Sequence, residues 1–184
     1  MKFPRPRAIA LFALLVSLCA VARLVPHWPN FTPLAAAALF SSLRMRSRLA
    51  AALVPCCGMA LSDLAIGGYE WKLMVVVYAA LSFPVLLRPL LAGRYQPARL
   101  LLAATISSLV FFFSTNFAVW YLGGWYASGL SGLSACYLAA LPFFKYNLLG
   151  DLFWSISLFA AYELHALARS RRLPAVTTIS YAQS

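Results

Sequence analysis

The sequence predicts an all-α integral membrane protein, a bundle of six helices. The chain of 184 residues is 63% hydrophobic and only 10% charged, whereas a soluble domain is nearer half apolar and a quarter charged. Apolar runs of membrane-spanning length recur along it. The basic residues form short clusters between these runs, as the loops of a membrane protein do. The composition therefore excludes a soluble fold, because the chain has too few polar side chains to cover the surface of a soluble protein.

Six spans are predicted within one transmembrane domain of residues 1–172, at about 8–25, 28–43, 49–66, 73–87, 100–121 and 146–167. The first run also fits a cleaved signal peptide, because residues 19–22 are small and lie near its end. A retained span is preferred because further spans follow directly. The polar tail 173–184 is predicted to be disordered.

Two runs are irregular. Residues 33–43 are too few for a span, but counting from Trp28 gives a segment that can cross a locally thinned bilayer. Residues 123–144 are apolar yet interrupted by four glycines and Pro142. This interrupted run is predicted to be a re-entrant or interfacial segment before the last helix.

The positions of the basic residues predict the topology. With both termini in the cytoplasm of a bacterial inner membrane, the clusters at 1–7, 44–48, 88–99 and 169–172 lie inside and hold twelve basic residues. The outer side then has only Arg23, Lys72 and Lys145, which satisfies the positive-inside rule. The net charge of +11 thus reflects membrane topology. No nucleic-acid motif is present, and no nucleic-acid partner is expected.

The stretch between the first two spans is the least ordinary part of the chain. Its three prolines cannot continue a helix and favour an extended loop. Between them lie four residues that can form hydrogen bonds: His27, Trp28, Asn30 and Thr32. We predict that this loop helps to form a small-molecule site at the outer face. The alternative is a rigid interfacial turn, since Pro, Trp and His are common at headgroup level.

Polar residues of several spans are expected to share the outer third of the bilayer with this loop. At 1.5 Å per helical residue, Asp63 lies roughly 22 Å and Asn116 roughly 25 Å from the inner surface, and Asp151 roughly 9 Å from the outer one. An ionisable residue inside a membrane is a functional candidate. The alternatives are that Asp63 ends its helix beside Gly67 and that Asp151 pairs with Lys145 or Arg23. Trp120 and Tyr137 are predicted at the same depth, where they could also form an aromatic belt.

Known catalytic motifs are absent from the sequence. It contains no Walker A motif, no metalloprotease histidine pair and no nucleophile elbow. Its four cysteines do not have zinc-site spacing. No catalytic residue, cofactor or metal site is predicted.

Several motifs resemble those of a family of uncharacterised small bacterial membrane proteins. They include PHWPNFTPLAA at 26–36, Ser62-Asp63 with Gly67, FFSTNFAVW at 112–120, ALPFF at 140–144 and GDL at 150–152. The resemblance covers most of residues 23–160. This family is often described as similar to the substrate-binding (S) components of energy-coupling factor (ECF) vitamin transporters.

The resemblance implies a transport function. S components have six membrane helices, and the loop joining the first two gates an outward-facing site. It implies that the present chain captures a vitamin- or cofactor-like metabolite, with residues 26–33 as the gate. Asn30, Thr32, Asp63, Asn116, Trp120 and Asp151 become site candidates, beside His27, Trp28 and Tyr137.

S components also dock on a transmembrane coupling protein that carries two ATPases. The small residues Ala35–Ala38, or Ala10, Ala13 and Leu14, could provide such a docking face here. Two other functions stay open. One is a membrane enzyme acting on a lipid-like substrate, with Asp63 or Asp151 as base. The other is an assembly partner without a ligand.

Overall fold

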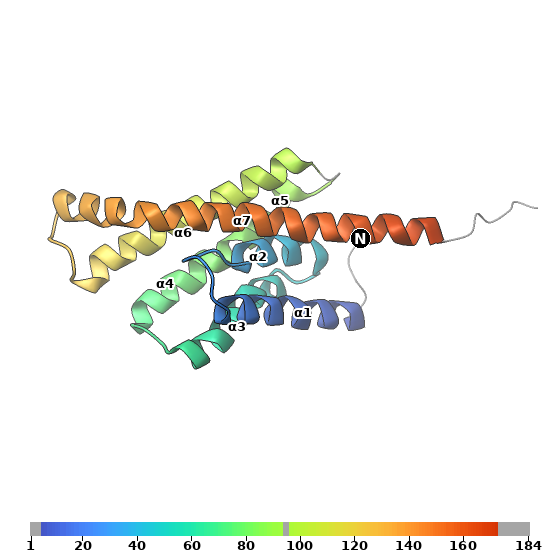
Figure 1. The fold of residues 1–184 in the computed structure, drawn as a ribbon, viewed down its shortest axis with the longest axis horizontal. Helices are drawn as coiled ribbons and strands as arrows, with labels where there is room; N and C mark the ends of the chain where they lie inside the picture. Colours follow the sequence, from blue (N-terminus) through green and yellow to red (C-terminus); the bar gives the residue numbers. More distant parts are fainter. Residues whose placement is uncertain (1–4, 94–95, 173–184) are drawn as a thin grey trace, which may run out of the picture.

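The computed structural model describes residues 5–93 and 96–172, and within them every regular element is helical (Figure 1). The predicted disordered tail, 173–184, lies outside these residues. The helices are α1 (Arg5–Leu24), α2 (Leu34–Arg44), α3 (Arg48–Ile66), α4 (Trp71–Ser82), the 3₁₀ helix η1 (Phe83–Leu87), α5 (Arg88–Leu91), α6 (Pro97–Gly123) and α7 (Leu130–Arg172). Since α4, η1 and α5 follow one another directly, the described residues form six helical segments, as the sequence predicts.

Local sequence signals set several helix ends. The Ser47 hydroxyl accepts a hydrogen bond from the Ala50 amide, 3.2 Å, at the start of α3. The Glu70 carboxylate does the same for the Leu73 amide, 3.0 Å, at the start of α4. Pro97 begins α6, where its missing N–H costs nothing. Gly124, with φ of 67°, ends α6 in the left-handed region.

Four helical stretches have the length and hydropathy of membrane spans: Pro6–Leu24, Arg48–Ile66, Trp71–Leu91 and Pro97–Gly123. They coincide closely with four of the predicted spans. Many large apolar side chains on these helices face outward and are exposed, which a lipid environment favours and water does not. The chain is a multi-pass membrane protein.

Helix α2 is the centre of the bundle. It contacts α1, α3, α4, α6 and α7, and all residues from Leu34 to Ser42 are buried. At 11 residues it is about 17 Å long and spans only part of an apolar core about 30 Å thick. Its burial corrects one expectation: Ala35–Ala38 is covered by the protein's own helices and is not a docking face. The α1 residues Ala10, Ala13 and Leu14 are exposed.

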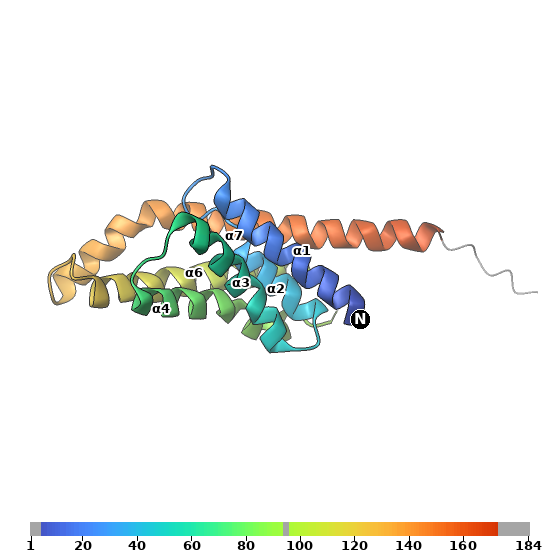
Figure 2. The same ribbon diagram turned by 90° about the horizontal axis from the view of Figure 1, so that it is seen from below.

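Helix α7 differs most from the prediction. The expected re-entrant segment before the last helix is not a separate element, because α7 runs without interruption from Leu130 to Arg172. Pro142 lies inside the helix, and Figure 2 shows α7 bending in its first third. A proline removes one helical hydrogen bond and bends a helix without ending it when neighbours hold both halves. Here α6 packs along α7.

Both ribbon views place the start of α1 and the end of α7 at the same end of the bundle (Figures 1 and 2). The arginine cluster at 44–48 between α2 and α3 lies at this end too, which we call the basic end. The connections after α1, α3 and α6 lie on the side away from the basic end, called the loop end, and the α6–α7 connection extends furthest in that direction (Figures 1 and 2). This alternation agrees with the predicted clustering of basic residues on one side.

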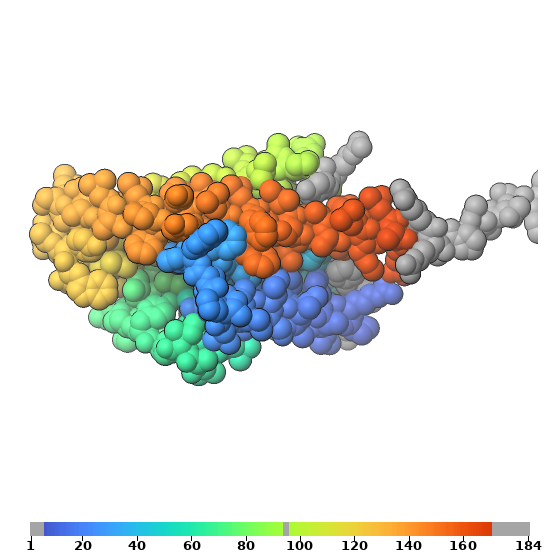
Figure 3. Space-filling view, in the orientation of Figure 1, coloured from blue at the N-terminus to red at the C-terminus, as the bar shows by residue number. Residues whose placement is uncertain are grey.

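The connection from Val25 to Pro33, called the proline loop, lies against α7 (Figure 3). The Trp28 ring stacks on Tyr146, with centroids 5.7 Å apart, and Phe31 contacts Phe153 at 5.6 Å. Gly150 allows the backbones to meet, because a Cβ there would lie 2.9 Å from the Phe31 Cα. Asn30, with φ of 62°, takes the left-handed conformation that Asn tolerates better than most residues. The loop thus has a defined seat on α7.

Candidate functional site

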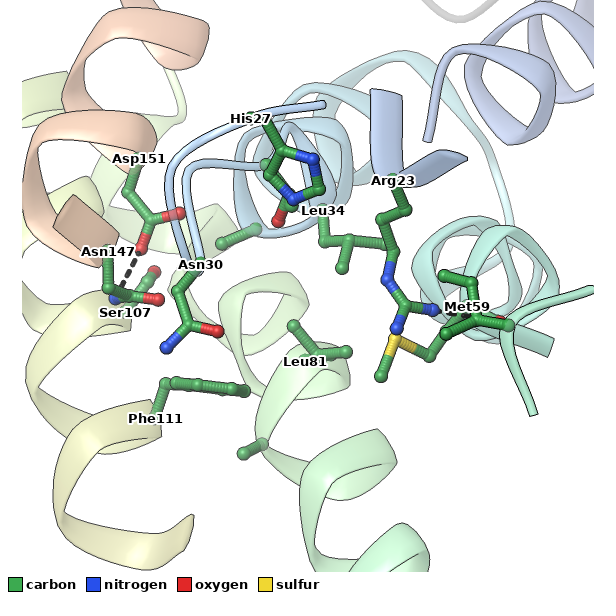
Figure 4. A pocket seen from close by; sticks show the side chains of 14 residues that line it. Arg23, His27, Asn30, Leu34, Met59, Leu81, Ser107, Phe111, Asn147 and Asp151 are labelled. Carbon is green, nitrogen blue, oxygen red and sulfur yellow. Dashed lines mark hydrogen bonds between the residues drawn. The ribbon is translucent and has the colours of Figure 1, made fainter. Parts of the chain in front are cut away.

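A pocket of about 160 Å³ lies beneath the proline loop. Because α2 is short, the loop rather than a helix closes this part of the bundle. Irregular backbone at membrane depth is tolerated where it lines such a cavity. The lining residues come from six helices and the loop: Arg23, His27, Asn30, Thr32, Leu34, Ala35, Met59, Ile66, Ala80, Leu81, Ser107, Phe111, Asn147 and Asp151 (Figure 4).

One wall of the pocket is formed by Arg23 at the end of α1. Its Nη1 lies 2.7 Å from Asp63 Oδ1 and 3.1 Å from the Met59 carbonyl oxygen, and it also donates to the Ser62 hydroxyl. The second carboxylate oxygen of Asp63 accepts from the Tyr78 hydroxyl at 3.0 Å. Asp63 is therefore fully partnered behind Arg23, and it does not line the pocket. The alternative predicted for Asp63, that it ends its helix beside Gly67, corresponds to the bond from the Gly67 amide to the Asp63 carbonyl, 2.9 Å.

The negative charge of Asp63 also affects Tyr69, in the loop after α3. Burial, together with this negative charge, raises the pKa of Tyr69 to about 12. Tyr69 therefore remains a neutral phenol at physiological pH.

The opposite wall contains Asp151, which is only 4% exposed. Its Oδ2 accepts hydrogen bonds from the Ser108 hydroxyl, 2.6 Å, and from Asn147 Nδ2, 3.2 Å. Figure 4 shows one carboxyl oxygen turned toward Asn147 and the other turned away from it, into the pocket. The expected alternatives, a pair with Lys145 or with Arg23, do not form: the ion pairs among the described residues are Arg23–Asp63 and Arg44–Glu163.

The position of Asp151 along the bundle can be compared with the predicted depth. Asp151 bonds to Ser108, nine residues after Arg99 in α6, and so lies about 14 Å from the basic end. This is near the middle of an apolar layer about 30 Å thick. The predicted depth of 9 Å from the outer surface took Lys145 as the start of the last helix, whereas α7 begins at Leu130.

The pocket brings together four of the residues predicted from the sequence: His27, Asn30, Thr32 and Asp151. Asn116 lines a smaller neighbouring cavity of about 130 Å³, which shares Asn30, Phe111 and Asn147 with the first. The Asn116 amide nitrogen donates to the Phe112 carbonyl at 2.8 Å. Asn116 thus belongs to an extension of the site.

Three predicted aromatic residues lie elsewhere. Trp120 Nε1 donates to the Ala127 carbonyl, 3.1 Å, at the tip of the α6–α7 hairpin. The Tyr137 hydroxyl donates to the Phe113 carbonyl, 2.8 Å, and its ring borders an apolar surface groove. Trp28 is 61% exposed and covers the outside of the loop. None of the three lines the pocket.

Sequence reasoning missed three polar residues of the site. Arg23 was considered only as an outer basic residue and as an alternative partner of Asp151, and Ser107 was not among the predicted site residues. Asn147 was not considered. The signal for Asn147 was present, because it lies four residues before Asp151 and so on the same face of one helix.

The pocket presents polar groups of several kinds. It offers N–H donors on the Arg23 wall, a carboxylate on the Asp151 wall, and amide and hydroxyl groups between them. Within residues 5–93 and 96–172, no group of three or more His, Cys, Asp or Glu side chains could hold a metal ion. The arrangement can orient a small polar molecule at both of its ends.

No curated protein and no solved structure matches the chain at a significant level, and nothing in these comparisons links it to S components. A family model described as a family of unknown function (DUF6580) matches residues 4–176. Since the match covers nearly all of the 184 residues, the chain belongs to the DUF6580 family.

Proposed function

We propose that this protein captures a small metabolite from the outer face of the membrane and delivers it for uptake, in the manner of an S component. The observation that carries the proposal is the pocket of about 160 Å³, in which polar groups from α1, the proline loop, α6 and α7 converge. Polar groups at membrane depth are expensive unless they are paired or serve a ligand. A concave site with a few convergent polar groups is the usual form of a small-molecule site.

Access from the outer side follows from the topology. The positive-inside rule assigns the basic end to the cytoplasm, so the loop end faces outward. The proline loop lies between the pocket and that side, and it touches α7 mainly through Gly150 and two aromatic pairs. Lifting this one loop would open the pocket without moving a helix. In this proposal the loop is the gate.

Uptake needs a source of energy, and the sequence contains no ATP-binding motif of its own. The proposal therefore includes a transmembrane coupling protein with ATPase subunits. The exposed face of α1 around Ala10, Ala13 and Leu14 offers a surface of small and apolar side chains on which such a partner could pack.

Native mass spectrometry of the protein, released gently from detergent, tests the proposal. A bound small molecule of defined mass is expected in the wild type and is expected to be lost in Asp151→Asn. Ser155→Ala is the matched control, because Ser155 is buried one turn further along α7 and does not line the pocket.

Other results would contradict the proposal. An apo mass for the wild type from every membrane preparation, with no metabolite bound, would favour an assembly partner. Turnover of a lipid extract that disappears in Asp151→Asn would favour the membrane enzyme.

A further inference from the structure

The charges around the pocket do not balance within the described residues. Arg23 and Asp63 neutralise each other at 2.7 Å. Asp151 receives only the neutral donors Ser108 and Asn147, both on its Oδ2. No Lys, Arg or His nitrogen of the described residues lies within salt-bridge distance of it. A carboxylate near the middle of a membrane is costly unless a positive charge accompanies it.

The two walls of the pocket differ in the hydrogen-bonding atoms that have no partner. On one wall, Nη1 of Arg23 carries its hydrogen bonds to α3, while its Nε and Nη2 have no hydrogen bond within the described residues. His27 Nδ1 donates to the Val25 carbonyl, 2.7 Å, so the other ring nitrogen of the neutral imidazole is an acceptor. On the opposite wall, Asp151 Oδ1 is the available atom. Figure 4 shows Arg23 and Asp151 on opposite sides of the space.

From this arrangement we infer that the ligand is a small organic cation, whose ammonium or protonated ring nitrogen lies on Asp151. A hydrogen-bond acceptor at its other end lies toward the unpartnered N–H groups of Arg23. This inference rests on the proposed function and specifies its substrate class. The cation supplies the positive charge that Asp151 lacks, and the acceptor uses N–H groups that the protein leaves without a partner.

The volume limits the size of this cation. The pocket measures about 160 Å³, close to the roughly 150 Å³ of an engineered cavity that holds one benzene molecule. Drug-sized ligands occupy pockets of about 300 Å³ or more. With the loop closed, the pocket therefore holds a single six-membered ring with a short substituent.

Three probes of matched shape test the charge. Benzylammonium, benzyl alcohol and benzoate share one ring and differ in carrying a positive, a neutral or a negative group. Binding of each to the full-length protein in lipid nanodiscs at neutral pH is measured by the shift of its thermal unfolding with probe concentration. We expect benzylammonium to bind about tenfold or more tighter than benzyl alcohol, and benzoate to bind weakest.

Two variants separate recognition from folding. In Asp151→Asn the preference for benzylammonium over benzyl alcohol is expected to vanish, while Ser155→Ala retains it. Equal binding of benzylammonium and benzyl alcohol by the wild type would overturn the inference, because Asp151 would then be protonated and neutral. Tighter binding of benzoate would also overturn it and would make Arg23 the recognition group.

The inference and the proposed function can fail separately. If no probe binds and native mass spectrometry identifies a copurified acid or neutral molecule, the inference of a cationic ligand is wrong, whereas the proposed metabolite site is supported. If no probe binds and no molecule copurifies, both are wrong.

Discussion

Asp63 and Asp151 make an instructive comparison, because both are buried aspartates of membrane-embedded helices. Asp63 has a guanidinium at 2.7 Å and a tyrosine hydroxyl at 3.0 Å on its two oxygens. Asp151 has two neutral donors on a single oxygen. The first carboxylate joins α1, α3 and α4, whereas the second leaves an acceptor open to a cavity. Charge compensation therefore separates a structural aspartate from a candidate binding aspartate.

The close approach of α1 and α3 explains why Asp63 can be partnered. A Cβ at Gly58 would overlap the Cβ of Cys19, so these two helices meet almost backbone to backbone. This contact brings the end of α1, and with it Arg23, within reach of the last turn of α3. Among the described residues, no comparable small-residue contact brings a cation to Asp151.

The largest effect is expected for Arg23→Met, which leaves Asp63 buried without its cation. Breaking a buried ion pair from one side costs about 3–5 kcal/mol. Reversible denaturation in mixed detergent micelles measures the free energy of unfolding. The double variant Arg23→Met with Asp63→Leu is expected to recover much of the loss, because it removes both charges. A double variant as unstable as the single one would show that the pair is not what Arg23 contributes.

A smaller loss is expected for Gly150→Val, which acts on the proline loop. The new Cβ would lie 2.9 Å from the Phe31 Cα, so the loop must move away from α7, at a cost of about 1–3 kcal/mol for overpacking. Labelling of Asn30→Cys by a membrane-impermeant maleimide from outside the cell is expected to accelerate in this variant.

Gly68→Val is the matched control for the loop, since a Cβ at Gly68 meets nothing within 4 Å. It should leave the labelling rate unchanged. Equal acceleration by both variants would mean that the loop is not held by its contact with Gly150.

The third effect concerns Tyr78→Phe, which deletes the 3.0 Å hydrogen bond to Asp63 Oδ2 and retains the ring. Hydrogen bonds to charged groups contribute about 1.5–3 kcal/mol, and we expect the lower value because Arg23 still neutralises Asp63. The same denaturation assay measures it. The loss should be nearly absent when Asp63 is already Leu, and a full loss in that background would assign the effect to ring packing.

The sequence predicts the fold well where hydropathy is the physical cause. The spans at 49–66 and 100–121 fall on α3 and α6, because a long apolar run has no other stable form in a membrane. It fails at α7, where the glycines and Pro142 suggested a break. Packing against α6 holds this helix together, and such a tertiary contact leaves no mark in the local sequence.

The site was predictable in part for the same reason. His27, Asn30, Thr32 and Asp151 were found because polar residues stand out in an apolar chain. The sequence could not show which polar residues have a structural role and which line the pocket, because this depends on which cation pairs with which carboxylate. Arg23 was equally available to Asp63 and Asp151 in the sequence. Only the packing of α1 on α3 decides the pairing.

The smallest effect on stability, and the most informative, is expected for Asp151→Asn. The substitution removes a charge that no cation of the described residues compensates, and its amide oxygen can still accept from the Ser108 hydroxyl. We therefore expect the free energy of unfolding to change by less than about 1 kcal/mol, or to increase. Asp63→Asn, the same chemical change at a paired carboxylate, should cost about 3 kcal/mol or more because it leaves Arg23 without its partner.

The two variants are compared by denaturation of the ligand-free protein. Similar losses would mean that Asp151 is also structural, and the distinction between the two aspartates would fall. If Asp151→Asn instead leaves the free energy of unfolding unchanged and the purified variant no longer contains a bound small molecule, ligand binding is the only role left for this carboxylate.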